Sequence, residues 1–202
     1  MVERIMVVAL DMDGPVVDLP PSHDVVRRSF KIWLPATKGA AEGIQYLTEQ
    51  PDVDLLGIFT KRSRLITQRQ TEKQLERFAI PVPVEKVVYT ANSSVRKLKA
   101  FYLAVAGPEI EVFKGKIVCP ENVGQIVLYD DSYRSIIEAS KKLAREEPHF
   151  SLLQKVFTLV AFNSRQPEKL KRESIPGVVH IVTMQDWTEN EIALTNVRKR
   201  IR

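Results

Sequence analysis

The sequence predicts an α/β fold, namely a Rossmann-like three-layer sandwich with a central, mainly parallel sheet between layers of helices. Short apolar runs that end in a polar or turn residue recur along the chain, and amphipathic stretches separate them. The 202 residues are 44% hydrophobic, which is enough for one substantial core. No repeat or low-complexity linker divides them. We therefore expect a single domain spanning residues 1–202.

Five apolar runs are the expected strands, and a sixth is an expected edge strand. Buried parallel strands have nearly continuous apolar sequence, and these runs have that character. The five runs are residues 5–10, 54–59, 86–89, 125–129 and 156–162, and the edge strand is residues 178–182. Amphipathic spacing predicts helices at residues 38–50, 65–78, 95–104, 135–146 and 186–200. Residues 108–124 are the least regular interior stretch.

Composition and charge exclude some classes of protein and favour others. No stretch approaches the roughly 20 apolar residues of a membrane span, and the first residues do not resemble an export signal. With a lone Cys119, which we interpret as an inert core thiol, this favours a cytoplasmic location. The net charge of +5 suits anionic partners. Residues 197–202 form an expected basic tail, either solvated or in contact with phosphates.

The first expected strand delivers two carboxylates, Asp11 and Asp13, to its carboxyl end. In a parallel sheet, sites form at that edge. Alternation along an extended chain puts both acids on the same side, while Met12 points away and Gly14 allows a turn. Two neighbouring anions repel unless a cation or a proton relieves the repulsion. The pair therefore predicts a divalent metal.

Two other interpretations of this pair compete with a metal site. A calcium-binding loop also begins Asp-x-Asp, but it requires Gly at its sixth position and Glu at its twelfth. Val16 and Ser22 stand there instead. For an isolated Asp-x-Asp-Gly, the acids could equally be strand-end caps with no chemistry. The other strand ends favour a site.

Further polar residues follow the other expected strands. Thr60 ends the second strand, and its hydroxyl can donate to a phosphoryl oxygen. The helix after the third strand supplies backbone N–H groups near Lys97. Asp130 and Asp131 end the fourth strand, where one acid can reach a metal while the other orients a neighbour. Mg²⁺ prefers such oxygen ligands.

In this order, Asp-x-Asp-Gly, Thr, Lys and Asp-Asp resemble the motifs of the haloacid dehalogenase-like (HAD) hydrolase superfamily over residues 5–140. The resemblance implies Mg²⁺ and phosphoryl transfer through an aspartyl-phosphate. It implies Asp11 as the nucleophile and Asp13 as the acid and base. Thr60 and Lys97 would hold the phosphoryl oxygens. The implied metal ligands are Asp11, the Asp13 backbone carbonyl and Asp131, with Asp130 as an alternative or supporting ligand.

Three features depart from the family pattern. Pro15 stands where Thr or Val is usual, which removes a backbone donor and leaves the local geometry open. Ser135 occupies the position, four residues after the acid pair, where a carboxylate is often found. The cationic role is also contested, since Lys99, Arg96 and Lys73 compete with Lys97 for it.

The chain has little room for a cap domain. Residues 14–35 form at most a short flap, whose His23, Arg27, Arg28 and Trp33 could bind an anion or simply belong to a helix with a polar face. An almost capless core resembles family members that act on nucleotides, nucleic-acid ends or phosphoproteins. The expected partner is a phosphorylated substrate of uncertain class, with nucleic acid possible.

Two alternatives belong to other functional classes. A receiver-type phospho-acceptor module also combines acids, Thr and Lys around Mg²⁺, but its acceptor Asp belongs after the third strand, where this chain has Tyr89 and Thr90. An inactive HAD-like scaffold could bind nucleic acid through the basic tail, and that binding would depend on salt.

Overall fold

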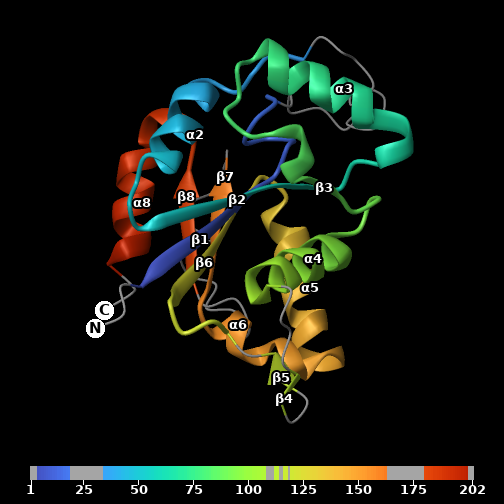
Figure 1. The fold of residues 1–202 in the computed structure, drawn as a ribbon, viewed down its shortest axis with the longest axis vertical. Helices are drawn as coiled ribbons and strands as arrows, with labels where there is room; N and C mark the ends of the chain where they lie inside the picture. The colour runs from blue at the N-terminus through green and yellow to red at the C-terminus, as the bar shows by residue number, and fades with distance from the viewer. Residues whose placement is uncertain are drawn as a thin grey trace.

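The computed structural model describes residues 4–18, 34–107, 112–113, 116–117, 119–162 and 180–199. These residues form a three-layer α/β sandwich in which helices cover both faces of one six-stranded parallel sheet (Figure 1). The predicted fold class is confirmed.

All six strands of the main sheet lie close to the expected positions. The last of them forms the edge beside its only partner strand, as predicted, but ends two residues later than expected. Residues 178–179, where it was expected to begin, lie outside the described part of the chain. The strands are β1 (Ile5–Leu10), β2 (Val53–Thr60), β3 (Val87–Tyr89), β6 (Val123–Asp130), β7 (Phe157–Phe162) and β8 (His180–Met184).

The strand order β3-β2-β1-β6-β7-β8 places β1 between β2 and β6. From β1 the chain moves outward to β2 and β3, then crosses to β6 on the other side of β1 and moves outward in the opposite direction. The order therefore reverses between β1 and β6. In open parallel sheets, ligands bind beyond the carboxyl ends of the strands at this reversal. The topology thus singles out the ends of β1 and β6.

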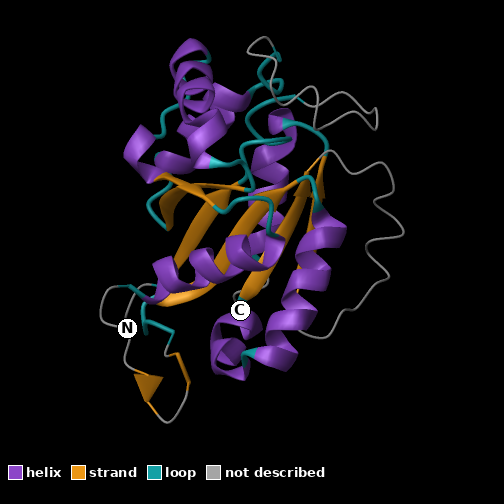
Figure 2. Ribbon diagram, turned by 90° about the vertical axis from the view of Figure 1, so that its right-hand side faces the viewer, coloured by secondary structure: helices purple, strands orange, loops and turns teal. Residues whose placement is uncertain are grey.

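Five helices correspond to the five predicted ones: α2 (Ala40–Thr48), α3 (Arg64–Arg77), α4 (Ser94–Ala106), α5 (Tyr133–Glu146) and α8 (Asn190–Arg198). The short α6 (Ser151–Lys155) and two 3₁₀-helices of the described residues were not expected, because so few residues do not display a helical period, and a third 3₁₀-helix lies within the helix predicted over residues 186–200. The 3₁₀-helices are η1 (Val84–Lys86), η2 (Pro148–Phe150) and η3 (Trp187–Glu189). Within the irregular stretch, β4 (Val112–Phe113) and β5 (Lys116–Ile117) pair as a small antiparallel hairpin, separate from the main sheet (Figure 2).

Both faces of the sheet are buried, so the central strands are apolar on both sides. Met6, Val8 and Leu10 of β1 pack into the cluster that includes residues of α2 and α8. Val7 and Ala9 pack into the opposite cluster, which includes residues of α4, α5 and α6. This alternation explains why the strand is a continuous apolar run. It also determines which way the next residues of the chain point.

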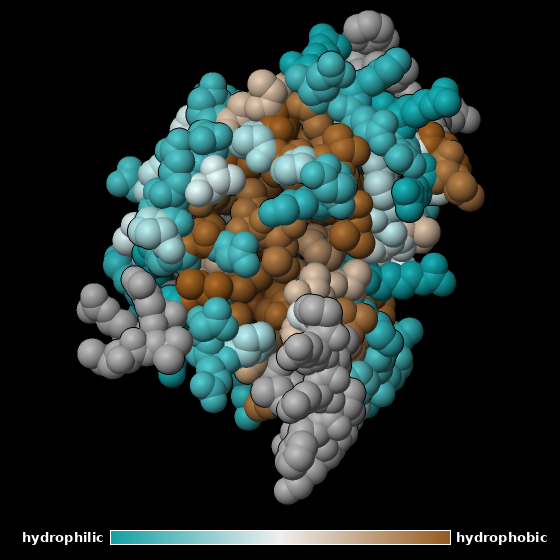
Figure 3. Space-filling view, viewed as in Figure 1, coloured by the Kyte–Doolittle hydropathy of each residue, from teal (hydrophilic) through white to brown (hydrophobic). Residues whose placement is uncertain are grey.

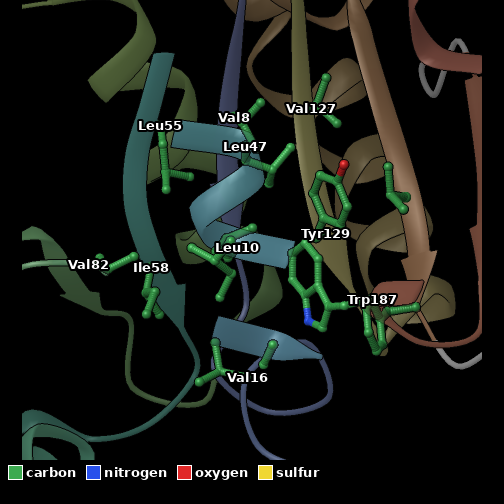
Figure 4. Packing of buried hydrophobic residues seen from close by; sticks show 14 of the residues in the cluster. Val8, Leu10, Val16, Leu47, Leu55, Ile58, Val82, Val127, Tyr129 and Trp187 are labelled. Carbon is green, nitrogen blue, oxygen red and sulfur yellow. The ribbon is translucent and has the colours of Figure 1, made fainter. Parts of the chain in front are cut away.

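The cluster on the α2 and α8 side extends to the loop after β1. Trp187 stacks on Tyr129 with ring centroids 5.3 Å apart and an angle of 13° between the planes (Figure 4). The Trp187 indole N–H donates to the carbonyl oxygen of Pro15 at 2.6 Å. Asp186 caps the 3₁₀-helix that begins with this tryptophan, because its side chain accepts from the backbone N–H of Thr188 at 2.9 Å. The C-terminal region therefore holds the backbone that follows the first pair of acids.

The first two residues of the expected basic tail, 197–202, lie in the last turn of α8, within the helix predicted over residues 186–200. Val197 is fully buried, and the guanidinium of Arg198 donates from Nε to Asp52 Oδ2 at 2.8 Å. Packing of the apolar helix face therefore orders the start of residues 197–202, and residues 200–202 lie outside the described part. Most of the expected flap, residues 14–35, also lies outside it, because residues 19–33 with His23, Arg27, Arg28 and Trp33 are not described.

None of the helices in the described ranges combines the length and the apolar composition that a membrane crossing needs. In the space-filling view, hydrophobic side chains gather over the middle of the visible face and hydrophilic ones surround them (Figure 3). Cys119 is partly buried against the cluster on the α4 and α5 side, and burial raises the pKa of its thiol. A raised pKa makes the reactive thiolate scarcer, in keeping with an inert thiol.

Candidate active site

Asp11 and Asp130 lie at the ends of the two neighbouring strands where the sheet order reverses. Asp11 directly follows β1, and Asp130 is the last residue of β6. Asp11 continues the side of β1 that carries Ala9, and Asp130 continues the side of β6 that carries Leu128, both of which face α4 and α5. The pleat of two adjacent parallel strands therefore directs both carboxylates toward the same helices.

Lys97, in the first turn of α4, lies between these two carboxylates. Its Nζ is 2.8 Å from Asp11 Oδ2 and 2.6 Å from Asp130 Oδ2. The lysine side chain is 0% exposed. Ser93 starts α4 by accepting from the backbone N–H of Arg96 at 3.1 Å, which sets the position of that turn. A fully buried ammonium needs such paired anions, because burying a lone charge is very costly.

The other candidates for the cationic role lie elsewhere. Lys99 pairs with Glu147 at 2.6 Å, and its side chain is 42% exposed. Arg96 and Lys73 are exposed on the surfaces of α4 and α3. Among the cations considered from the sequence, the structure therefore places Lys97 against the strand-end acids.

Three carboxylates meet at this point of the sheet. Asp11, Asp130 and Asp131 each offer one oxygen, and these three oxygens lie within 4.8 Å of one another. Asp130 is strongly bonded, since its Oδ1 accepts from the Ser132 backbone N–H at 2.7 Å and its Oδ2 accepts from Lys97. Asp131 accepts a longer bond, 3.2 Å, from the Ser132 hydroxyl. Asp131 thus retains more capacity to bind an ion, while Asp130 orients Lys97.

Among the described residues, the raised pKa values of Asp11 and Asp131 indicate more negative charge in the cluster than the neighbouring cations balance. Burial, the largest cause, raises the pKa of Asp11 to about 8, and the charges of Asp130, Asp13 and Asp131 act in the same direction against Lys97. Burial and the Asp130 charge raise the pKa of Asp131 to about 6. Burial lowers the pKa of Lys97, but the two carboxylates outweigh it and raise that pKa overall. A proton or a divalent cation would relieve the excess charge.

The donor set fits a hard divalent cation. Carboxylate oxygens are the protein ligands that Mg²⁺ prefers, and Mg²⁺ keeps several waters, so a few carboxylates are sufficient. Asp11 and Asp131 could hold such an ion, with Asp130 in support. The family resemblance implied the backbone carbonyl of Asp13 as a further ligand, while the side chain of Asp13 pairs with Arg62 and lies outside the cluster.

The Asp13 carboxylate pairs with Arg62, a residue that sequence reasoning missed. Arg62 Nη2 lies 2.5 Å from Asp13 Oδ1. Thr60, at the end of β2, is buried, and its Oγ1 accepts from the backbone N–H of Arg62 at 3.2 Å. Because the Thr60 oxygen is the acceptor in that bond, the hydroxyl proton takes no part in it. Arg62 follows Thr60 by two residues at the same sheet edge, and that position was the signal available in the sequence.

A second cation of the same loop was also missed. Lys61 Nζ donates to the Ser132 hydroxyl at 3.0 Å. Its charge lowers the pKa of Asp131, although burial and Asp130 outweigh it. The loop after β2 therefore brings positive charge to the end of β6, across β1.

Gly14 packs directly against Asp131, and Gly14→Ala is expected to destabilise the protein by about 1–3 kcal/mol. A Cβ at this position would lie 2.5 Å from Asp131 Cβ, and the backbone φ of +95° disfavours any L side chain. Urea unfolding would measure the loss. Gly107→Ala is a matched control, since that glycine also has positive φ, +77°, but no atom within 4 Å of an added Cβ. Equal losses for both variants would contradict a role for the Asp131 contact.

The raised pKa of Asp131 predicts that the metal-free protein loses stability as pH rises. The carboxyl titrates at about 6 when folded and 3.8 when unfolded, so its contribution is fully present below pH 3.8 and is lost as pH passes 6. The difference is on the order of 3 kcal/mol. Urea unfolding with a chelator at pH 4.5 and pH 7 should show Asp131→Asn gaining stability relative to the parent at the higher pH. A pH-independent difference between the two proteins would contradict this.

Comparison of the chain with protein-family models, with curated proteins and with solved structures finds no match.

Proposed function

We propose that this protein is a Mg²⁺-dependent phosphatase of the HAD type, which hydrolyses phosphate monoesters through a phosphoryl group carried on Asp11. The observation that supports it most is the environment of Asp11. This carboxylate lies at the reversal of strand order, contacts the buried ammonium of Lys97 at 2.8 Å, and has two further carboxylates within 4.8 Å. Such a concentration of buried charge is costly for folding alone, and functional sites are where it is commonly found.

In the first step, a carboxylate oxygen of Asp11 forms a bond to phosphorus while the bond from phosphorus to the ester oxygen breaks. The electron pair of that bond leaves with the ester oxygen, which takes a proton from the Asp13 carboxyl group and departs as an alcohol. Lys97 favours the ionised form of Asp11 that this attack requires, because the ammonium lies 2.8 Å from Oδ2.

In the second step, a water oxygen forms a bond to phosphorus and the bond to Asp11 breaks. The ionised Asp13 takes a proton from the attacking water, so Asp11 returns to its carboxylate form and phosphate is released. Asp13 is suited to both steps by its place in the fold. Its side chain is 21% exposed, whereas that of Asp11 is 2% exposed, so solvent and the leaving alcohol have access on its side of the site.

The remaining residues would bind the phosphoryl oxygens and the ion. Lys97 would donate to a phosphoryl oxygen as charge shifts toward it, and the Thr60 hydroxyl has a proton available for another. Asp11 and Asp131 would hold Mg²⁺, with Asp130 fixing Lys97. Bound Mg²⁺ would withdraw charge from the phosphoryl group and reduce its repulsion from the acids.

The test is turnover by the purified protein. Release of phosphate from para-nitrophenyl phosphate should depend on Mg²⁺ and stop with a chelator. A panel of nucleotides, sugar phosphates, phosphopeptides and DNA ends would then identify the preferred class of monoester. No hydrolysis of any of these substrates with Mg²⁺ present would overturn the proposal.

A further inference from the structure

The ion pair between Arg62 and Asp13 has an unusually complete geometry for two side chains at the edge of a sheet. Arg62 Nε is 3.2 Å from Asp13 Oδ1 and 3.1 Å from Oδ2, and Nη2 is 2.5 Å from Oδ1. The guanidinium side chain is only 3% exposed. Bidentate arginine–carboxylate pairs fix direction as well as distance. The Asp13 carboxylate is therefore held in one orientation.

The guanidinium also forms hydrogen bonds with two residues of α3, which lies at the top of the molecule in Figure 1. Its Nη1 donates to the Thr71 hydroxyl at 3.0 Å and to Gln74 Oε1 at 2.7 Å. Both partners are buried in the helix. The direction of the guanidinium is thus set by α3 without help from Asp13, so Arg62 can impose an orientation on the carboxylate.

This orientation keeps Asp13 apart from the other acids. The group of carboxylate oxygens within 4.8 Å of one another consists of Asp11, Asp130 and Asp131 and does not include Asp13. A carboxylate two residues from Asp11 would otherwise be free to join an ion bound there, because divalent cations readily recruit nearby carboxylates. A carboxylate bound to an ion could not transfer protons.

We infer that Arg62 is a positioning residue for Asp13: it keeps the Asp13 carboxyl out of the metal cluster and aims it where it exchanges protons with the leaving and entering oxygens. This inference rests on the proposed function. Arg62 is poorly placed to bind the substrate phosphate itself, because its Nε–H, both Nη1–H groups and one Nη2–H are already used. One remaining N–H does not allow the bidentate bonding through which arginine recognises phosphate.

The kinetic test compares leaving groups. A poor leaving group such as the alkoxide of ethyl phosphate needs a proton as it departs, whereas para-nitrophenolate does not. Arg62→Met should lower kcat on ethyl phosphate by about 100-fold and on para-nitrophenyl phosphate by less than about 10-fold. Asp13→Asn should show the same pattern, and adding Arg62→Met to it should have little further effect. Arg64→Met is the matched control, since Arg64 is exposed and its Nε donates to Gln68 within α3.

A second readout does not depend on activity. Calorimetric titration with Mg²⁺ should show tighter binding to Arg62→Met, by several-fold, because Asp13 is released to become a ligand. Asp13→Asn in that background should restore the parent affinity. If Arg62→Met unfolds, the double variant Thr71→Val and Gln74→Leu keeps the arginine but loosens it, and both effects should appear in weaker form.

The outcomes separate the two proposals. An active parent protein in which Arg62→Met slows both phosphates equally, with unchanged Mg²⁺ affinity, would overturn the positioning role alone. A rise in KM shared by both substrates would do the same, since it would indicate direct phosphate binding. A parent protein without activity on any phosphate would overturn the proposed function, and the role of Arg62 with it.

Discussion

Replacing Asp11 by asparagine is expected to lower the proposed phosphatase turnover by at least about 1000-fold, because the amide cannot serve as the proposed nucleophile. Asparagine has nearly the same shape and can still accept the bond that Asp11 Oδ1 accepts from the Met12 backbone N–H at 2.8 Å. The loss should therefore lie in kcat and not in folding. Phosphate release from para-nitrophenyl phosphate would measure it. A rapidly quenched reaction with radiolabelled substrate should leave label on the parent protein and none on the variant.

The matched control for this experiment is Asp54→Asn. Asp54 is an exposed acid near the amino end of β2, at the opposite edge of the sheet from the site. The Asp54→Asn variant should retain the turnover and the labelling of the parent protein. Retained turnover by Asp11→Asn, or label that stays on the variant, would show that the phosphoryl group is carried elsewhere and would contradict the assignment of the nucleophile.

The second large effect is expected from Lys97→Met. Methionine fills a similar volume but leaves Asp11 and Asp130 buried without their shared cation, whose Nζ lies 2.8 and 2.6 Å from their oxygens. Removing one partner of a buried ion pair costs about 3–5 kcal/mol. Urea unfolding of the metal-free protein at pH 7 should show this loss of stability. Turnover should also fall by at least about 100-fold, because the ammonium proposed to bind phosphoryl oxygens is lost.

Two further variants test the cause of that loss. Lys99→Met removes a lysine two residues away that pairs with Glu147 on the surface, and it should cost less than about 1 kcal/mol. Adding Asp130→Asn to Lys97→Met replaces one of the two carboxyl groups that lost their shared cation by a neutral amide, so part of the lost stability should return while activity stays low. Similar losses for both lysine variants would contradict a special role for the buried ammonium.

Much of the fold could be predicted from local sequence patterns. A strand such as β1, buried on both faces, is an apolar run, and a helix such as α2 repeats apolar residues along one face. These repeats of apolar residues appear in the sequence because each element buries the same side along its whole length. The hairpin of β4 and β5 and the short α6 escaped prediction, since two to five residues are too few to show a period.

The sequence also predicted which edge of the sheet carries the candidate site. Asp11, Thr60 and Asp130 each end or follow an apolar run, and the strands are parallel, so their carboxyl ends share one edge. The contacts of the expected basic tail were harder to predict. Arg198 has the same charge as its neighbours in sequence, and the helix predicted over residues 186–200 included it, but its contact with Asp52 was not predictable from the sequence.

The sequence by itself determined that the chain forms a parallel α/β sheet and that acids, a hydroxyl and a lysine gather beyond the ends of its strands. Only the tertiary structure decided which residues pair with one another. It places Lys97, and not Lys99, between two carboxylates. It also shows that Asp130 is more strongly hydrogen-bonded than Asp131, and that Arg62 holds Asp13. The reason is physical. Periodicity records which side of an element is buried, but an ion pair between residues far apart in the chain depends on where each helix lies on the sheet.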